Sequence, residues 1–376
     1  MSNCWEAEVI QTTGKRWKSV LVPIVLAWGL FSLIACGAGD EAPHSGLTSD
    51  ELLSGQALGD ESSGSGGGLV AGDEGVGLPV PNQAGDGAID PLLDPAILAA
   101  SEVGDGTRAP SFPVVVRASD GDVIVDSERQ RIVSLSPTAT EILFAIGAGD
   151  RVVAADRGST FPAAAPAKSE LSARNPDPAA VAAYQPDLVI LETSSSGVAG
   201  LEHDGVVVIT FEPAIHVEET VHQVRQLGLA TGQLAGAAEQ VDHIQSMLAS
   251  MTEAVAAADA VRIYHEVDAT FLSPSSRSFF GELYTRLGME NIADQVEQGE
   301  NRYVTLNSDL IRNADPTVIV VANARSSADS VRGRPGWDAI SAVTRGRVIE
   351  VDFAATTTWG PRALAVVDQV VQAATS

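Results

Sequence analysis

Apolar residues follow two distinct patterns from residue 112 to the end of the chain. Short apolar runs, such as 131–135 and 187–191, have the length and the β-branched content of strands buried on both faces. Between such runs lie stretches whose apolar residues recur every three or four positions, as in 217–230 and 361–374, which predicts amphipathic helices. Because strands alternate with helices, the pattern predicts an α/β fold with parallel sheets.

The longest helical pattern covers residues 234–258. No Gly or Pro follows Gly236 within it, so we expect an unbroken helix of about six turns, roughly 33 Å long at 1.5 Å per residue. The order helix, Pro, buried strand occurs at 181–191 and again at 311–321, on the other side of this helix. This repeat favours a helix that joins two lobes of similar construction. A surface helix on a single α/β domain is the alternative.

The predicted fold class is therefore α/β, with two Rossmann-like lobes that contain parallel sheets and are joined by one long rigid helix. We expect an N-terminal lobe at 111–233, the linking helix at 234–258 and a C-terminal lobe at 259–376. Parallel sheets bind ligands beyond the carboxyl ends of their strands. Two facing lobes would direct these ends into one shared cleft.

The first 35 residues have the pattern of a secretory signal. A basic segment, 15–18, precedes an apolar run, 19–35. The sequence LIA directly before Cys36 resembles the lipobox of bacterial lipoproteins, in which this cysteine is acylated and becomes the first residue. We therefore expect a signal peptide at 1–35, a lipidated Cys36 and anchoring to the outer face of the cytoplasmic membrane. An uncleaved signal anchor is the alternative.

The segment that follows has the composition of a tether. Residues 37–110 contain 16 of the 35 Gly residues, thirteen acidic residues and one basic residue. Such a segment cannot bury enough apolar surface to offset the entropy of ordering, so we expect a disordered acidic tether at 36–110. The net charge of −26 argues against nucleic acid as a partner, because phosphates require clustered Lys and Arg. With only Cys4 and Cys36 in the chain, the predicted lobes contain no disulfide and no thiol nucleophile.

Five segments of the predicted lobes resemble, in the same order, the substrate-binding proteins of ABC importers for cobalamin, haem and ferric siderophores. They are RIVSLSPTATEILFAIGAGDRVV (131–153), NPDPAAVAAYQPDLVIL (175–191), YHEVD (264–268), SFFGELYTRLGMENIAD (278–294) and RPGWDAISAVTRGRVIEVD (334–352). The resemblance covers about 112–376 and implies a ligand held between two lobes, with docking on an ABC permease and its ATPase. The third and fourth segments are most similar to the cobalamin-type branch.

The resemblance implies a transport component and not an enzyme. We expect a monomer that captures a metal-chelate ligand, a corrinoid in preference to haem or a ferric siderophore. Such a ligand carries its own metal, so we expect no cofactor and no protein metal site. Docking in this family uses a surface carboxylate on each lobe; Glu202 and Asp329 are the candidates, with an ordinary solvated carboxylate as the alternative for each.

The ligand-binding candidates of the first lobe are polar residues that follow strands or precede helices. They are Ser136, Pro137, Thr138, Asp156, Arg157, Arg174, Asn175, Glu192 and Thr193. Residues 136–138 offer hydroxyls and helix N-terminal amides, although helix capping explains them equally well. Arg157 or Arg174 suits a ligand carboxylate or phosphate, with a surface ion pair as the alternative. Some cobalamin binders carry an aromatic residue at the position of Glu192.

The candidates of the second lobe are mainly aromatic, because a flat macrocycle favours aromatic faces. They are Tyr264, His265, Phe271, Tyr303 and Trp337. For each aromatic residue, core packing is the alternative. Haem would need an axial ligand, for which Tyr264, His265 and Tyr303 are the candidates.

Three other functions remain as alternatives. An exported hydrolase is a distant one, since no Gly-x-Ser-x-Gly, P-loop or His-Glu-x-x-His motif is present. A protein that captures free metal ions would use His216, His222, His243 or His265, but no His-rich loop accompanies them. The third alternative is a sensor domain that works without a transporter.

Overall fold

The computed structural model describes residues 111–192, 200–201, 205–296, 299, 301–322 and 325–376. These residues belong to one compact unit that extends over Leu69–Ser376. The predicted signal peptide, Cys36, the whole of the predicted tether, Thr193 and Glu202 lie outside the described residues.

The first half of the described chain forms a parallel sheet with the strand order β4-β3-β5-β6. Its strands are β3 (Ile132–Leu135), β4 (Val152–Ala155), β5 (Leu188–Leu191) and β6 (Val207–Thr210). Every residue of β3 and β5 is buried, as expected for central strands with helices or loops on both faces. The register places Leu135 beside Leu191, so the polar residues that follow these two strands emerge at the same edge.

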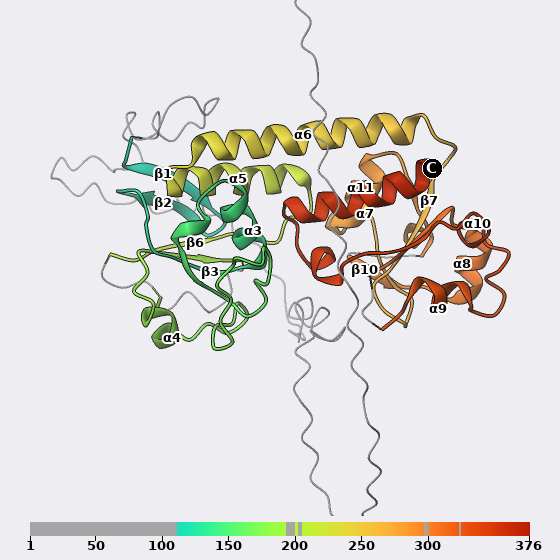
Figure 1. Cartoon of the computed structure of the whole chain (residues 1–376), viewed down its shortest axis with the longest axis horizontal. Helices are drawn as coiled ribbons and strands as arrows, with labels where there is room; N and C mark the ends of the chain where they lie inside the picture. The colour runs from blue at the N-terminus through green and yellow to red at the C-terminus, as the bar shows by residue number, and fades with distance from the viewer. Residues whose placement is uncertain (1–110, 193–199, 202–204, 297–298, 300, 323–324) are drawn as a thin grey trace, which may run out of the picture. The chain divides into compact units, whose positions relative to one another are not determined.

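Around this sheet lie a β-hairpin and three helices (Figure 1). They are β1 (Val114–Ala118), β2 (Gly121–Val125), α3 (Pro137–Ala145), α4 (Pro178–Ala182) and α5 (Val217–Thr231), with a 3₁₀ turn at Gly149–Arg151. The helix predicted from the pattern at 217–230 is confirmed as α5.

The second half forms another parallel sheet, with the strand order β12-β11-β7-β9. Its strands are β7 (Arg262–Glu266), β9 (Glu290–Asn291), β11 (Val318–Val321) and β12 (Val348–Glu350). Two short strands, β8 (Leu272–Pro274) and β10 (Tyr303–Thr305), form a separate antiparallel pair. The sequence pattern did not predict this pair, because strands of three residues are too short to show a periodicity.

The helices of the second half are α7 (Phe279–Arg286), α8 (Ser308–Ala314), α9 (Ala328–Arg332), α10 (Ser341–Thr344) and α11 (Pro361–Thr375), with 3₁₀ helices at Ile292–Gln295 and Phe353–Thr357. Helix α10 begins only at Ser341, and Gly336 before Trp337 has a φ of 75°, which belongs to a turn and not to a helix.

The long helix α6 (Leu234–Ala256) connects the two halves, as predicted (Figure 1). It packs against α5 and α11, and its first turn passes very close to α3: a Cβ on Gly236 would lie 2.1 Å from the carbonyl oxygen of Ile146. One apolar cluster continues from the first sheet through α5, α6 and α11 to the second sheet. The helix is therefore an integral part of the core.

Among the described residues, no helix combines the length and the hydropathy that a membrane span requires.

Candidate functional site

The first candidate region lies at the carboxyl edge of the first sheet, where Ser136 follows β3. Its side chain caps α3 by accepting a hydrogen bond from the backbone N–H of Ala139 at 3.0 Å. The same hydroxyl donates to Oε2 of Glu192, the residue after β5, at 2.6 Å. Capping, one of the two predicted roles of Ser136, is therefore observed, and the bond to Glu192 joins two predicted site residues. Pro137 occupies the first turn of α3, and Thr138 is buried beside it.

Asp156 follows the neighbouring strand β4 and is buried. It accepts hydrogen bonds from the backbone N–H of Gly158 at 3.0 Å and from the hydroxyl of Ser159. Burial raises the pKa of Asp156, and these hydrogen bonds oppose the rise. The guanidinium of Arg157 is exposed, while its backbone N–H donates to the carbonyl of Leu171 at 3.0 Å.

Glu192 is half-buried, and burial raises its pKa to about 7. The nearby charges of Asp156 and Glu141 contribute to this rise in pKa, whereas hydrogen bonds from Ser136 and Thr138 oppose it. The carboxyls of Asp156 and Glu141, whose own pKa values are raised, thus both act on Glu192; we call Glu141, Asp156 and Glu192 the acidic cluster. A raised pKa means that the fold disfavours the ionised form, so each charge is retained at a cost in stability.

The one buried member of the cluster that forms an ion pair is Glu141, on α3. Its Oε1 lies 2.8 Å from Nη2 of Arg362, at the start of α11 in the second half of the chain. Burial nevertheless raises the pKa of Glu141 to about 7, since the Arg362 charge offsets only part of the desolvation. Arg362 also pairs with Asp352 at 3.1 Å, and its guanidinium lies 4.6 Å from the centre of the Phe161 ring.

Among the described residues, Phe161 stands out as a large apolar residue with 45% of its surface exposed to solvent. It belongs to the loop after β4, a few residues beyond Asp156. Sequence reasoning missed Phe161, Glu141 and Arg362. The signal for Phe161 was its place in the loop after a strand, which is the criterion that selected Asp156 and Arg157.

Arg174 and Asn175 are exposed and precede α4. The backbone N–H of Asn175 donates to the hydroxyl of Ser172 at 3.4 Å. The predicted role of Arg174 and Asn175 in ligand binding stays a prediction.

The carboxyl edge of the second sheet is organised around Arg334. Its guanidinium donates to both oxygens of Glu266, at 2.5 and 2.7 Å, and Glu266 is completely buried at the end of β7. The hydroxyl of Tyr264 donates to the same carboxylate at 3.1 Å. The guanidinium also lies 5.1 Å from the ring centre of Phe271 and 4.7 Å from that of Trp337. We call these five residues the Arg334 clamp.

The clamp encloses most of the aromatic side chains that the sequence offers to a macrocycle. Tyr264 and Trp337 have no exposed surface, and the indole N–H of Trp337 donates to the hydroxyl of Ser308 at 2.8 Å. Core packing, the alternative that the sequence left open for each, accounts for these contacts. Phe271 is half-buried and stacks on Trp337 with ring centres 6.1 Å apart.

His265 and Tyr303 do not join the clamp. Nδ1 of His265 lies 2.9 Å from the hydroxyl of Tyr284, and burial lowers the pKa of His265 to about 3, so the ring is neutral. Tyr303, in β10, is half-buried, and burial raises the pKa of its hydroxyl. Asp329, the docking candidate of the second half, is exposed and pairs with Arg332 at 2.7 Å.

The four histidines considered for free metal lie on different elements. His216 precedes α5 and lies 3.8 Å from Glu282, His222 contacts the carbonyl of Arg117 at 3.2 Å, and His243 is exposed on α6. Within the described part of the chain, no three His, Cys, Asp or Glu side chains come together as a metal site requires.

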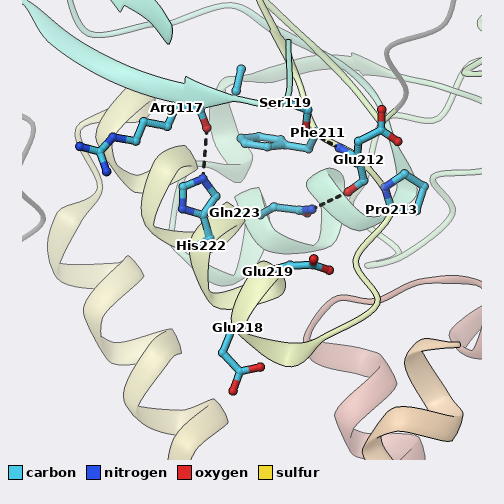
Figure 2. A pocket seen from close by; sticks show the side chains of 10 residues that line it. Arg117, Ser119, Phe211, Glu212, Pro213, Glu218, Glu219, His222 and Gln223 are labelled. Atoms are coloured by element: carbon cyan, nitrogen blue, oxygen red, sulfur yellow. Dashed lines mark hydrogen bonds between the residues drawn. The ribbon is translucent and has the colours of Figure 1, made fainter. Parts of the chain in front are cut away.

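A separate hollow with a volume of about 340 Å³ lies beside β6 and α5 (Figure 2). Its floor includes the ring of Phe211, and two of its side chains are held by backbone carbonyls: His222 contacts Arg117 and Gln223 donates to Glu212 at 2.9 Å. The remaining lining residues are Ala118, Ser119, Pro213, Glu218 and Glu219. Sequence reasoning did not predict this hollow.

Comparison with known proteins identifies the family. The family profile described as "Periplasmic binding protein" matches residues 132–355, more than half of the chain. The chain belongs to the periplasmic binding protein family. The predicted resemblance is therefore confirmed, and with it the expectation of a transport component that is not an enzyme. The family acts in the periplasm or outside the cell.

Two curated relatives indicate where the chain belongs within this family. The "Uncharacterized ABC transporter substrate-binding lipoprotein YvrC" of Bacillus subtilis (strain 168) is 27% identical over 272 residues, which are 69% of this chain and 85% of that protein. The "Cobalamin-binding protein" of Halobacterium salinarum (strain ATCC 29341 / DSM 671 / R1) is 29% identical over 235 residues, 60% of this chain. The match spans 63% of the length of the Halobacterium protein, which is less than two thirds.

Solved structures share the fold. The vitamin B12-binding protein BtuF of Vibrio cholerae has a TM-score of 0.53 and 21% identity, covering 65% of this chain and 96% of that one. The haem-binding protein RhuT of Roseiflexus sp. RS-1 has a TM-score of 0.56 and 19% identity, covering 65% and 98%. These likenesses confirm the predicted α/β fold with two lobes.

Proposed function

We propose that this periplasmic binding protein is the lipid-anchored substrate-binding component of an ABC importer and that its ligand is a corrinoid. The observation that carries the proposal is the 29% identity over 235 residues with a cobalamin-binding protein. Haem and iron chelates are the alternative ligands, since solved structures of proteins named as binding them have a similar fold. The protein would hold its ligand between the lobes and deliver it to a permease with its ATPase.

The exposed ring of Phe161 supports a macrocyclic ligand. The ring lies in the loop after β4, on the same lobe as Ser136 and Glu192, and the charge of Arg362 covers part of it. A corrin offers a broad apolar surface with polar groups around its rim, and an aromatic ring next to hydroxyls and carboxyls complements both. Ser136, Thr138, Asp156, Arg157, Phe161 and Glu192 are the residues that we propose to contact it.

Haem is less well matched to the described residues. Two of the three candidates for an axial ligand, Tyr264 and His265, are enclosed and bonded to other side chains. Tyr303 is the remaining candidate, since it is half-buried. A corrinoid brings its own metal complex and needs no such ligand.

The proposed localisation rests on the lipobox-like sequence before Cys36 and on the name of the Bacillus relative, which is a lipoprotein. We propose that Cys36 carries the lipid and that Asp329 takes part in docking, with Glu202 on the other lobe. Radiolabelled palmitate supplied to cells that express the chain should label it, and Cys36→Ser should abolish the label. Labelling that persists in this variant would contradict the anchor.

Ligand binding is tested with the full chain in detergent, titrated with cyanocobalamin, haemin and a ferric hydroxamate siderophore. Isothermal titration calorimetry should show one cyanocobalamin bound per chain, with weaker or no binding of the other two. A preference for haemin or for the siderophore would reassign the ligand within the same transport function. Binding of none of the three would contradict the proposed function.

A further inference from the structure

The carboxyl of Glu192 occupies a fixed position at the edge of the first sheet. It follows the fully buried strand β5, and the hydroxyl of Ser136 donates to its Oε2 at 2.6 Å. Ser136 is itself held by its capping bond to Ala139, and Glu192 directly follows the last residue of β5. A half-buried carboxyl that is held in this way can meet a ligand with little loss of conformational entropy.

The charges around Glu192 are mostly negative. Asp156, from the loop after β4, and Glu141, from α3, both act on it through space. The cation nearest to Glu141 is Arg362 of α11, but its guanidinium already pairs with Glu141 and Asp352 and covers the ring of Phe161. Arg157 is exposed to solvent, where screening weakens its effect. A ligand carboxylate beside Glu192 would therefore meet repulsion from partly desolvated charges of the same sign.

Hydrogen-bond donors would meet the opposite situation. A carboxylate accepts hydrogen bonds strongly, and a ligand amide N–H₂ can occupy that position without adding charge. Rejecting a wrong ligand through a buried like charge is an effective form of specificity. In the ligand-free protein the position of Glu192 is energetically unfavourable, because burial disfavours the ionised form of its carboxyl. Ionisable residues whose pKa values are shifted in this way are concentrated at functional sites.

From this geometry we infer that Glu192 is a specificity-determining residue, which makes the site select macrocycles rimmed by amides over macrocycles rimmed by carboxylates. The inference rests on the proposed function and names the ligand class more narrowly. It places amide-bearing corrinoids within the class and haem, with its carboxylate side chains, outside it.

The test compares two ligands with the same corrin ring. Dicyanocobinamide carries amides on its rim, and dicyanocobyrinic acid carries carboxylates in the corresponding places. Both are titrated at pH 8 into the full chain in detergent, and binding is followed by calorimetry and by the visible absorbance of the corrin. We expect cobinamide to bind at least about tenfold more tightly, the factor that corresponds to one pKa unit of like-charge interaction.

Two variants separate the role of Glu192 from that of overall charge. Glu192→Gln keeps the size of the side chain and one acceptor oxygen but removes the charge, so it should bring the two affinities close to each other, mainly by improving the binding of cobyrinic acid. Glu253→Gln removes one exposed carboxyl from α6, far along the chain, and should leave the ratio unchanged. In the wild-type protein the ratio should also fall when the pH is lowered from 8 to 6, because Glu192 then becomes protonated.

Equal binding of the two corrins by the wild-type protein, or the same ratio in Glu192→Gln, would overturn the inference while corrinoid binding stands. Binding of neither corrin would overturn the proposed function as well. The wild-type pH series keeps the test decisive if the variant does not fold.

Discussion

The two sheets have the same parallel construction, but their carboxyl edges are chemically different. At the second sheet, the charge of Glu266 is matched by a bidentate bond from Arg334 and a third bond from Tyr264, and two aromatic rings cover the guanidinium. At the first sheet, Glu141, Asp156 and Glu192 all have raised pKa values. The Arg334 clamp satisfies its own charges, whereas the acidic cluster does not.

This difference indicates a division of roles within one site. Groups that satisfy one another form a rigid wall and have little left to offer a ligand. Groups whose burial is unfavourable gain when a ligand supplies hydrogen bonds, and the exposed ring of Phe161 lies in the same lobe as the acidic cluster. If the ligand binds as proposed, the first lobe would carry the chemistry that selects it, and the clamp would fix the shape of the second lobe.

The largest expected effect comes from breaking the clamp. Arg334→Met keeps an unbranched apolar stem but leaves Glu266 buried without its charged partner, so the free energy of unfolding should fall by about 3–5 kcal/mol. Arg312→Met is the matched control, because its ion pair with Asp309 is exposed and should contribute about 0–1 kcal/mol. Urea unfolding followed by circular dichroism measures both. Equal losses in the two variants would show that the clamp is no more than a surface pair.

An intermediate effect is expected at Phe161, and it concerns binding and not stability. Phe161→Ala removes an exposed ring, so the free energy of unfolding should change by less than about 0.5 kcal/mol. The affinity for cyanocobalamin should fall by about 1–3 kcal/mol if the ring lies against the corrin. Tyr184→Ala is a suitable control. Tyr184 follows α4 and is a partly exposed aromatic residue, whose hydroxyl donates a hydrogen bond to Glu170. A similar loss of affinity in both variants would contradict the role of Phe161.

The sequence could predict those parts of the site that are local. Ser136 stands where a buried strand meets a helix-capping sequence, and Glu192 directly follows another buried strand, so strand-end reasoning located both. The bond between them follows from the parallel register of β3 and β5. The fold was predictable for the same reason, since long periodic stretches such as α5, α6 and α11 carry strong signals.

The parts that were missed depend on contacts between distant segments. Arg362 contacts Glu141 and Phe161, although about 200 residues of sequence separate it from them. The periodicity of apolar residues cannot predict such a long-range contact. Phe161 stands in a loop rich in Ala and Pro, where pattern reasoning has no period to detect. For Trp337 the sequence left both ligand contact and core packing open, and its contacts with Tyr264, Phe271 and Ser308 correspond to core packing.

The smallest effect, and the one that compares the two edges most directly, is the pH dependence contributed by Glu192. Its pKa of about 7 in the folded protein exceeds the usual value of 4.5, so between these two pH values the folded state binds more protons than the unfolded state. Stability from this group is fully present below pH 4.5 and is lost as the pH rises through 7. Glu192→Gln removes this loss, and it should stabilise the ligand-free protein by about 1–2 kcal/mol at pH 8, a figure reduced for the partial exposure of the side chain.

Near pH 4.5 the same variant should differ little from the wild-type protein, because Glu192 is then protonated in the folded state. Urea midpoints measured at both pH values give the comparison, with Glu253→Gln as the control that changes net charge on the exposed face of α6. A destabilised Glu192→Gln at pH 8 would mean that the hydrogen bonds from Ser136 and Thr138 outweigh the burial of the charge. The charges at the carboxyl edge of the first sheet would then be matched by their own hydrogen bonds, as those of the Arg334 clamp are. The proposed division of roles between the lobes would then be wrong.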